Sequence, residues 1–454
     1  MNIAIIGAGT AGMSAAYDLT RDGHDVTIFE SDNQVGGLAS GFEEPHWDWS
    51  VEKYYHHWFA SDAHILELID ELGLRQKVIF PRPYTVLLHN DKWYPFDSIL
   101  QALCFPGLGW GLNKMRFGLV GLYLRLTNNW RALEKFTVDA WMRKWAGDKV
   151  YETMWQPMMM GKFGAHYKNV NMAWFWARIH ARTTKLGTYW GGFQAFCDDF
   201  ANILREMGVE IHLSTPVRGI APSPPPPGLT ATPLPLSQFL GEGEGGWGGG
   251  GEGITLETKT GRHHFDRVLS TISPPQMAKL TPALPENYSQ GLLNLTSTGA
   301  VVMTLSLEHK LSEQGYYWFN IPKNAGFPFL AVVEHTNYVS TDHFGGDHIL
   351  YCGDYVEADH EYFDLNKDEL LERFIPGIQK INPSFGRDWI KKVWLHRTKY
   401  GQPVPMLNHS QHIPAIQTPI PGLYFASMSQ VYPWDRGTNY AVKIGRRAAR
   451  MMSS

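Results

Sequence analysis

The spacing of apolar residues along the chain predicts alternating strands and helices. Residues 2–6 and 26–29 are short apolar runs typical of buried strands, and a helical stretch lies between them. Residues 191–207 carry apolar side chains at helical spacing, and Gly208 is a suitable stop. These apolar positions are Phe193, Phe196, Phe200, Ile203, Leu204 and Met207.

Later parts of the chain predict further strands and one terminal helix. The helix opens at residues 435–442 and runs through Arg446 and Arg447. The expected strands are 209–213, 217–220, 254–258 and 265–270, forming a meander with a turn at 260–261, and a late strand at 422–428. The pattern as a whole indicates an α/β fold.

A glycine motif stands between the first strand and the first helix. Gly7, Gly9 and Gly12 form G-x-G-x-x-G, and Glu30 follows the second strand, 18 residues after Gly12. Gly7 makes the tight turn, Gly9 admits a pyrophosphate and Gly12 lets the helix pack on the strands. Glu30 is placed to bind a ribose. In this context a dinucleotide site is favoured over an ordinary glycine-rich turn.

Residues 31–40 decide which dinucleotide is expected. They contain Gly36 and Gly37, and this segment resembles the second glycine pair of the flavoprotein superfamily of amine oxidases, phytoene desaturases and protoporphyrinogen oxidases. The resemblance implies FAD, because the pair passes close to its pyrophosphate and isoalloxazine ring. Leu38 departs from the basic residue that often follows the pair, which removes one phosphate contact.

The C-terminal segment resembles the same superfamily. There a strand–loop–helix unit returns to the first domain, and the helix N-terminus stabilises charge at the flavin N1/O2 edge. Thr438 and Asn439 are the expected N-caps, and Ala441 allows close approach. Ser427 stands where the family usually has Gly followed by an acid. The alternative is a terminal helix that merely covers the sheet.

The resemblance also places the backbone of Val217 at the adenine end of FAD. The full set of expected cofactor residues is Gly7, Gly9, Thr10, Ala11, Gly12, Glu30, Ser31, Gly36, Gly37, Leu38, Ala39, Val217, Ser427, Thr438, Asn439, Tyr440 and Ala441. No metal site is expected, and the widely spaced Cys104, Cys197 and Cys352 suggest neither a disulfide framework nor a zinc site.

The expected architecture is a discontinuous Rossmann-like FAD-binding domain with an α+β substrate domain. The first comprises residues 1–75, 186–275 and 401–454, and the second comprises residues 76–185 and 276–400. Residues 222–253 are rich in proline and then in glycine, which predicts a disordered insert within the meander rather than a domain boundary.

Composition narrows the expected partners and compartment. The 454-residue chain has 40 basic and 44 acidic residues and a net charge of −4, which gives no electrostatic case for nucleic acid. The first strand begins at residue 2, so no signal peptide is expected and the cytoplasm is the natural compartment. The expected partner is a small molecule, and the oligomeric state is left open.

The substrate domain is rich in tryptophan and methionine, which suits a lipophilic or ring-containing substrate, although each side chain alone is better explained as core. Residues 99–126 lack the uninterrupted apolar run of a membrane span. A buried helical hairpin is favoured there, and an amphipathic helix in peripheral contact with a membrane is the alternative.

Two patches carry candidate catalytic residues. Tyr55, His56 and His57 follow the glycine pair at the distance where the family's chain passes the flavin, and at most one of the histidines is expected to face it. Tyr432 and Arg436 precede the last helix, where Arg436 is a candidate for binding an anionic group or the flavin O2 edge. A solvated helix cap is the competing interpretation of Asp435 and Arg436.

The resemblance implies an FAD-dependent oxidoreductase that transfers hydride from a C–H or C–N bond of an apolar or ring-containing substrate to flavin N5. Two alternatives stay open. One is a non-redox flavoenzyme resembling UDP-galactopyranose mutase. The other is a flavin-binding partner protein without turnover.

Overall fold

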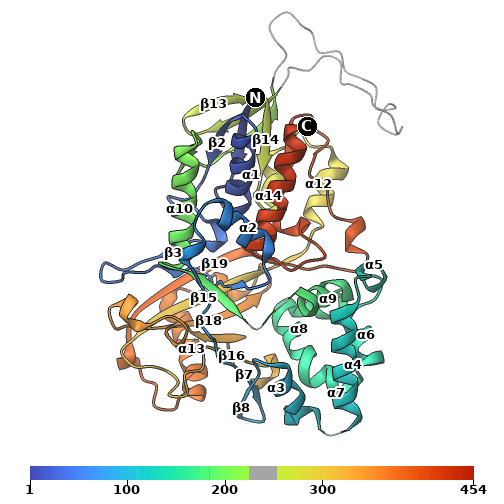
Figure 1. Ribbon diagram of the computed structural model, residues 1–454, viewed down its shortest axis with the longest axis vertical. Coiled ribbons are helices and arrows are strands. Elements are labelled where there is room, and N and C mark those ends of the chain that lie inside the picture. The colour runs from blue at the N-terminus through green and yellow to red at the C-terminus, as the bar shows by residue number, and fades with distance from the viewer. Residues whose placement is uncertain (110, 182, 184, 224–252) are drawn as a thin grey trace, which may run out of the picture.

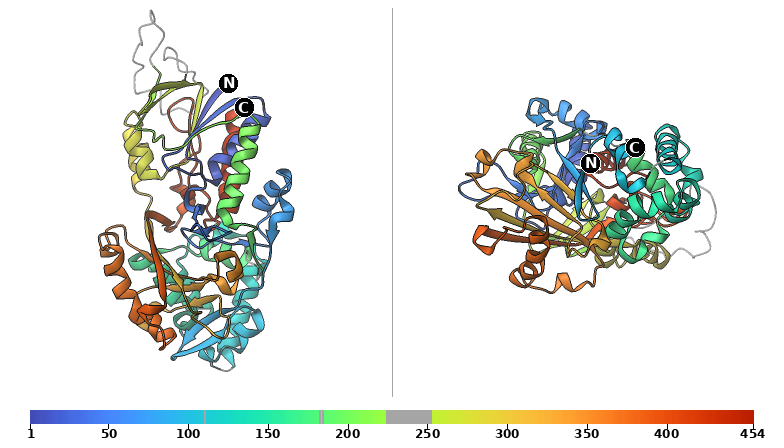
Figure 2. Two further views of the ribbon diagram at one scale, coloured as in Figure 1. Left: turned by 90° about the vertical axis from the view of Figure 1, so that its left-hand side faces the viewer. Right: turned by 90° about the horizontal axis from the view of Figure 1, so that it is seen from below.

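A computed structural model describes residues 1–109, 111–181, 183, 185–223 and 253–454. Figure 1 shows an elongated molecule with a parallel sheet and its helices at one end and a larger mixed sheet at the other. A group of helices lies beside the larger sheet, and both termini lie at the end formed by the parallel sheet. The views in Figure 2 show the same division. The expected fold class, a Rossmann-like part joined to a second part that contains a sheet, is confirmed.

The parallel sheet holds the glycine motif. Its strands, in spatial order, are β10 (Glu210–His212), β2 (Asp25–Phe29), β1 (Asn2–Ile6), β14 (Arg267–Ser270) and β20 (Leu423–Phe425). Alternate residues of β1 serve opposite faces: Ile3 and Ile5 belong to one hydrophobic cluster, and Ala4 and Ile6 belong to another. Because both faces of the sheet are covered, its central strand reads as a continuous apolar run.

Four helices belong to the first of these clusters. They are α1 (Thr10–Arg21), α2 (Ala63–Glu71), α10 (Gly192–Glu206) and α14 (Thr438–Ser453). The predicted apolar positions Phe193, Phe196, Phe200 and Leu204 of α10 are buried in that cluster. Their helical spacing along the sequence places them on one face of the helix. In Figure 1, α1 and α14 run side by side, although they stand at opposite ends of the sequence.

The opposite face carries a three-stranded antiparallel sheet, β11 (Gly219–Pro222), β12 (Ile254–Thr258) and β13 (Gly261–Phe265). The predicted meander was therefore only partly right, because β10 and β14 join the parallel sheet instead. The predicted disordered insert lies outside the described residues, apart from its ends. Those ends meet, since Pro222 pairs with Ile254 and the Ser223 amide donates to the Gly253 carbonyl at 3.0 Å.

The larger sheet has seven strands in the order β19-β15-β18-β17-β16-β7-β8. Their bounds are β19 (Ile390–Pro403), β15 (Ser297–Leu307), β18 (His348–Val356), β17 (Ala331–Glu334), β16 (Trp318–Asn320), β7 (Thr85–His89) and β8 (Lys92–Pro95). Helix α13 (Lys367–Ile381) packs on one face through Leu370, Phe374 and Ile378. The two halves of the predicted substrate domain thus share one sheet.

Helices α11 (Pro274–Leu280) and α12 (Glu286–Leu293) behave differently, because Met277 and Leu292 pack into a cluster of the parallel sheet. The exact domain division stays a prediction. Short strands complete the β structure: β3 (Gly41–Phe42) with β4 (Val51–Glu52), and β5 (Trp58–Phe59) and β6 (Val78–Ile79) on either side of β9 (Leu186–Tyr189).

The remaining helices form the group beside the larger sheet. They are α3 (Ile99–Cys104), α4 (Leu112–Leu126), α5 (Trp130–Leu133), α6 (Val138–Trp145), α7 (Asp148–Val150), α8 (Gln156–Phe163) and α9 (Met172–Ala181). Among the described residues, no helix is long and apolar enough to cross a membrane.

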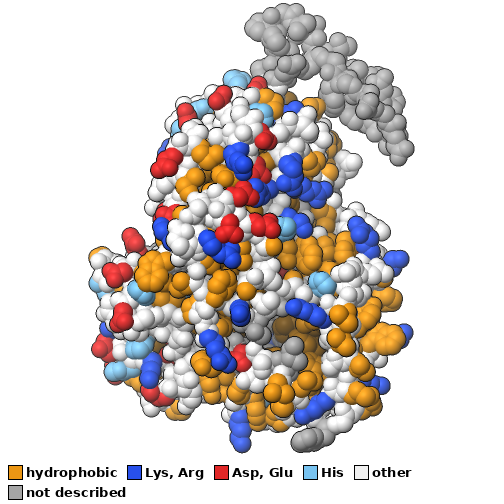
Figure 3. All heavy atoms as spheres, viewed as in Figure 1, with side chains coloured by type: hydrophobic (Ala, Val, Ile, Leu, Met, Phe, Trp, Pro, Cys, Tyr) orange, Lys and Arg blue, Asp and Glu red, His pale blue; other side chains and the backbone are white. Residues whose placement is uncertain are grey.

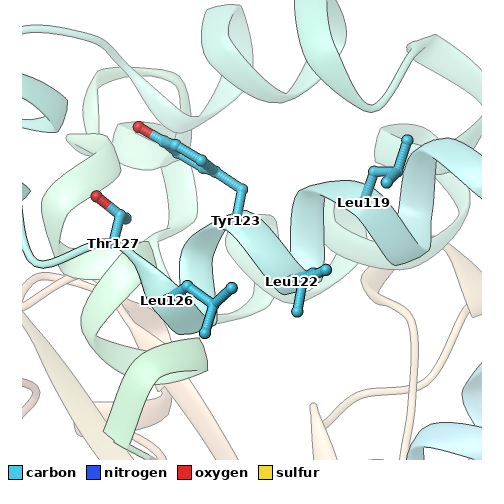
Figure 4. Close-up of a pocket in the computed structure, with 5 residues that line it drawn as sticks. All are labelled: Leu119, Leu122, Tyr123, Leu126 and Thr127. Carbon is cyan, nitrogen blue, oxygen red and sulfur yellow. The ribbon is translucent and has the colours of Figure 1, made fainter.

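The expectation that residues 99–126 form a buried hairpin was wrong for its second helix. Leu124 is the buried residue of α4, whereas Leu119, Leu122 and Leu126 are 59%, 55% and 70% exposed. Together with Tyr123 and Thr127 they line a shallow apolar groove (Figure 4). Figure 3 shows hydrophobic side chains interspersed with Lys and Arg over this group of helices.

Candidate functional site

The first glycine motif is closely packed in a way that requires glycine at two positions. Gly7 has φ +106°, and a Cβ atom there would lie 2.5 Å from the Thr271 hydroxyl oxygen. A Cβ atom on Gly12 would lie 2.0 Å from the Gly7 carbonyl oxygen, so the first turn of α1 packs against the turn at Gly7 with no room for a side chain. These are the tight turn and the close helix packing that the motif predicts.

The two glycine motifs meet in space, although they stand far apart in the sequence. Gly9 and Gly36 form a parallel bridge, and the Gly36 amide donates to the Ala8 carbonyl at 2.9 Å. A Cβ atom on Gly37 would lie 3.3 Å from the Gly9 Cα atom. Side chains at these positions would fill the space over the turn, so the cradle fits a group that approaches the backbone closely.

The N-terminus of α1 supplies hydrogen-bond donors to this cradle. Thr10, Ala11 and Gly12 form its first turn, the N-cap is Gly9, and neither a side-chain cap nor an acidic residue is present there. The first amides of a helix have no partner within the helix, and the helix dipole favours an anion. These residues fit the pyrophosphate of FAD.

Glu30 lies 8% exposed at the end of β2. Its Oε2 accepts the Ala8 amide at 2.7 Å, and its Oε1 accepts the Asp32 amide at 2.8 Å and the Ser31 hydroxyl at 3.0 Å. Glu30 therefore fixes the glycine turn itself. Each carboxylate oxygen can accept more than one hydrogen bond, so the predicted contact with a ribose stays compatible with this arrangement.

At the C-terminal end, the expected caps of α14 have other partners. Gly437 is the N-cap, the Thr438 hydroxyl accepts the Trp58 indole N–H at 2.9 Å, and the Asn439 carbonyl Oδ1 accepts the Ile65 amide at 3.1 Å. The capping prediction was wrong. The consequence is that the first turn of α14 has no side-chain cap, which suits the predicted approach to the flavin N1/O2 edge.

The other expected cofactor residues lie around these elements. Leu38 and Ala39 form a short 3-10 turn with Gly37. Tyr440 stacks on Trp434 with ring centroids 5.4 Å apart, and the Ser427 amide donates to the Gln430 side chain at 2.6 Å. Val217 is buried in the cluster between the parallel sheet and the antiparallel one. Their contacts with FAD, like that of Ala441 in the first turn of α14, stay predictions.

A pocket joins the cofactor segments to the larger sheet. Leu38, Tyr55, His56 and Arg436 all line it, so the structure brings residues from the N-terminal part of the chain together with the segment before the last helix. Its other lining residues are Tyr54, Ala300, Val302, Asp354, Tyr355, Thr398 and Gly401, from the segment after β4 and from β15, β18 and β19.

Arg436 is held on the pocket wall by neutral partners. Its Nε donates to the side-chain oxygen Oε1 of Gln402 at 2.9 Å, and its Nη2 donates to the Tyr355 hydroxyl. The guanidinium also lies over the Tyr355 ring, 5.2 Å from the centroid. Arg436 can therefore face a substrate or a flavin oxygen, and the solvated-cap interpretation does not describe it.

Asp435 is an anchor to the helical group, with a side chain 12% exposed. Its carboxylate accepts the Trp174 indole N–H at 3.1 Å and pairs with Arg178 of α9, and Lys162 of α8 lies 3.8 Å away. The loop before α14 is thus fixed against helices whose sequence is remote from it.

Burial sets the protonation of the pocket groups. It lowers the pKa of His56 to about 4, with Arg436 acting in the same direction and the Tyr54 carbonyl acting against it. Burial raises the pKa of Tyr55 and Tyr54 well above the ordinary value. Near neutral pH these side chains are a neutral imidazole and two protonated phenols.

Two of the five catalytic candidates are not among the lining residues. His57 packs edge-on against Phe59 and Trp318 and is not a lining residue of the pocket. The expectation that at most one of the two histidines faces the flavin stays a prediction. Tyr432 packs on Trp130, and its hydroxyl donates to Glu134 at 3.0 Å. We therefore retain Tyr55, His56 and Arg436 as candidates.

No sequence pattern predicted the lining residues that come from the larger sheet. Ala300, Tyr355 and Thr398 meet because β15 pairs with both β18 and β19, with Ala300 opposite Tyr355 on one side and opposite Thr398 on the other. Residues opposite one another in a sheet share a face. No local sequence motif predicts that pairing.

A second buried acid, Glu52, lies in β4 near this region and is 1% exposed. Its carboxylate accepts the Phe193 amide and the Tyr351 hydroxyl, each at 3.2 Å. Burial raises its pKa to about 7, and these hydrogen bonds only partly oppose the effect. Among the described residues, no cluster of His, Cys, Asp and Glu suitable for a metal ion was found.

Comparison with known proteins identifies the family. The model of the family described as "Flavin containing amine oxidoreductase" matches residues 10–453. The chain belongs to this family. Membership confirms the expected flavin cofactor, FAD, and the expected class of FAD-dependent oxidoreductases.

Solved structures have the same fold at low sequence identity. Cyclohexylamine oxidase from Brevibacterium oxydans IH-35A matches with a TM-score of 0.71 and 16% identity, over 100% of this chain and 98% of that one. Reduced UDP-galactopyranose mutase matches with a TM-score of 0.73 and 14% identity, over 99% and 93%.

Matches to curated relatives are local. Protoporphyrinogen oxidase 2, chloroplastic/mitochondrial, from Arabidopsis thaliana is 35% identical over 79 residues, which are 17% of this chain and 15% of the relative. The sequence match thus spans far less than two thirds of that relative's length.

Proposed function

We propose that this flavoenzyme removes hydride from a C–H bond, including one next to nitrogen, of a ring-containing substrate. The observation that carries the proposal is the pocket where Leu38, which follows the second glycine pair, meets Tyr55, His56 and Arg436. When bound, FAD supplies the hydride acceptor at N5. The protein residues bind and orient the substrate beside it, and the tyrosine rings suit a flat or cyclic group.

The lining favours a substrate with polar groups over a wholly apolar one. Tyr54, Tyr55, Tyr355 and Thr398 carry hydroxyl groups, and Arg436 offers a cationic donor. We therefore narrow the expected apolar or ring-containing substrate to a ring-containing one with polar substituents. The test is anaerobic mixing of the purified yellow protein with amines, porphyrinogens, isoprenoids and nucleotide sugars. Substrate-dependent loss of the visible flavin absorbance is expected, and isoprenoids are expected to be inactive.

A redox-neutral reaction like that of UDP-galactopyranose mutase is the second candidate. Arg436 with Tyr355 favours it, because a guanidinium beside phenol hydroxyls is suited to a diphosphate. The two candidates differ in one measurement. The mutase alternative predicts turnover of a nucleotide sugar only after dithionite reduction, with no bleaching of the oxidised protein by substrate.

We also propose peripheral contact with an anionic bilayer through α4. Its exposed apolar side chains Leu119, Leu122 and Leu126 follow helical spacing, and residues 98–133 contain four basic residues and no acidic one. Apolar burial combined with attraction to anionic lipid is the usual basis of interfacial binding.

Flotation with phosphatidylglycerol-containing vesicles tests this contact. The wild type is expected to float with them, and the double substitution Leu119→Glu and Leu126→Glu is expected to abolish flotation. Leu293→Glu, on the similarly exposed Leu293 of α12, is the matched control. Equal flotation of the double variant and the wild type would refute the contact.

A further inference from the structure

The ring of His56 has a defined tautomer. Its Nδ1 lies within hydrogen-bonding distance of the Tyr54 carbonyl oxygen. A carbonyl oxygen accepts only, so in the neutral ring Nδ1 carries the proton and Nε2 carries the lone pair. Burial, with Arg436 nearby, keeps the pKa of this ring near 4. The lone pair on Nε2 is therefore present at neutral pH.

The surroundings of His56 leave few other proton acceptors. Tyr54, Tyr55 and Tyr355 are phenols, and Arg436 is a donor only. Asp354 borders the pocket, but its neighbour Tyr355 shares the sheet face of Ala300, so the Asp354 side chain points to the opposite face, where it pairs with Lys323 at 2.6 Å. Among the described residues, no side chain donates a hydrogen bond to His56 Nε2.

The ring is also fixed from behind. Phe193, at the start of α10, packs against it with centroids 5.7 Å apart, and the Phe193 amide is held by the buried Glu52. The acceptor atom therefore stands on a rigid part of the molecule, which lowers the reorganisation that a proton transfer requires.

We propose that His56 Nε2 accepts a proton from an O–H or N–H group of the substrate, on the atom next to the carbon that loses hydride. This role rests on the proposed oxidoreductase function. FAD, when bound, would supply the two-electron acceptor for the hydrogen and the electron pair of the C–H bond. The O–H or N–H bond breaks, its electron pair completes a C=O or C=N bond, and the proton goes to Nε2. The substrate class is thus a cyclic alcohol or amine that is oxidised to a ketone or imine.

His57 provides a matched control, because it is the adjacent histidine and does not line the pocket. The experiment compares the holoenzymes of the wild type, His56→Asn and His57→Asn, using cyclohexanol and cyclohexylamine as probes. Anaerobic flavin reduction in His56→Asn is expected to slow by about 10²–10⁴-fold, the usual contribution of general acid–base catalysis. Added imidazole should restore part of the rate. His57→Asn should remain near the wild-type rate, and FAD content should be unchanged in both variants.

A binding readout separates this role from the proposed function. Perturbation of the oxidised flavin spectrum gives the affinities for cyclohexanol and for cyclohexanone, which lacks the donor hydrogen. The wild type and His57→Asn should prefer the alcohol, and His56→Asn should lose that preference.

The outcomes are distinct. Reduction by one probe alone would name the alcohol or the amine as the substrate class. Equal reduction rates in the wild type and His56→Asn would overturn the role, as would a slow variant with no imidazole rescue and an unchanged alcohol preference. If neither probe reduces the wild type but His56→Asn loses the alcohol preference, the acceptor assignment stands and the proposed oxidation of these compounds fails.

Discussion

The buried carboxylate of Glu52 accepts a hydrogen bond from the Tyr351 hydroxyl at 3.2 Å, which links β4 to the seven-stranded sheet. Tyr351 in turn packs edge-on against Tyr55 on the pocket wall, with ring centroids 5.8 Å apart. A single buried acid thus connects the chain after the second glycine pair to the wall contributed by the larger sheet.

Glu52 should make stability depend on pH. Its pKa is raised from 4.5 to about 7 in the folded protein, so the protonated form is favoured there. The raised pKa adds about 3 kcal/mol to the free energy of unfolding at pH 4.5 and below. This contribution is lost as the pH rises to about 7. Glu52→Gln should therefore gain stability relative to the wild type between pH 5 and pH 8.

Denaturant unfolding of both proteins at the two pH values measures this difference. Between pH 5 and pH 8, the free energy of unfolding of the variant minus that of the wild type is expected to rise by about 2–3 kcal/mol. The same offset at both pH values would show that Glu52 does not change its ionisation on folding.

Gly9→Val should abolish FAD binding by placing side-chain bulk between the two glycine motifs. A Cβ atom added to Gly9 would lie 4.0 Å from the Gly37 Cα atom. The two methyl groups of a valine side chain would extend beyond this Cβ atom into the cradle. Gly291→Val is the control, because a Cβ atom there meets nothing within 4 Å. The measurement is FAD released on denaturation, per mole of protein. Stoichiometric, tightly held FAD in Gly9→Val would contradict the site.

Deleting residues 223–252 and closing the gap with a short turn should leave flavin content and melting temperature nearly unchanged. The flanking strands β11 and β12 already pair in register up to Pro222 and Ile254, and loop-closure cost varies weakly with length. Differential scanning fluorimetry of the holoprotein measures the outcome. Loss of folding would show that the deleted residues pack against the rest of the molecule.

Arg436→Ala should retain FAD, because the glycine cradle holds the other end of the cofactor. A lost charge-assisted hydrogen bond is worth about 1.5–3 kcal/mol, and ~30 mV of a two-electron potential corresponds to about 1.4 kcal/mol. The flavin potential should therefore fall by roughly 30–60 mV, or substrate affinity should weaken equivalently. Unchanged potential together with unchanged substrate affinity would assign Arg436 a structural role with Gln402 and Tyr355.

Elements that follow from local sequence patterns could be predicted from the sequence. The strands of the parallel sheet, α1, α10 and the start of α14 follow from apolar spacing and from glycines whose neighbours leave no room for a side chain. The caps of α14 could not be predicted, because Trp58 and the Ile65 amide reach Thr438 and Asn439 only in the folded chain.

Pairing between distant segments also explains what was missed. Strands were correctly predicted within residues 209–213 and 265–270, but they were assigned to the wrong sheet. In the structure β10 pairs with β2 and β14 pairs with β1, both in parallel. The wall formed by Ala300, Tyr355 and Thr398 depends on the register of three strands. Likewise α4 has an apolar composition, and only tertiary packing determines that its outer face stays uncovered.

Anaerobic reduction of the bound flavin by a substrate deuterated at the carbon that loses hydride tests the proposed hydride transfer directly. We expect the substrate to bleach the oxidised protein and deuterium to slow this bleaching, because cleavage of the C–H bond is the chemical step. Absence of bleaching by every ring-containing alcohol, amine and porphyrinogen, with nucleotide-sugar turnover appearing only after dithionite reduction, would contradict it.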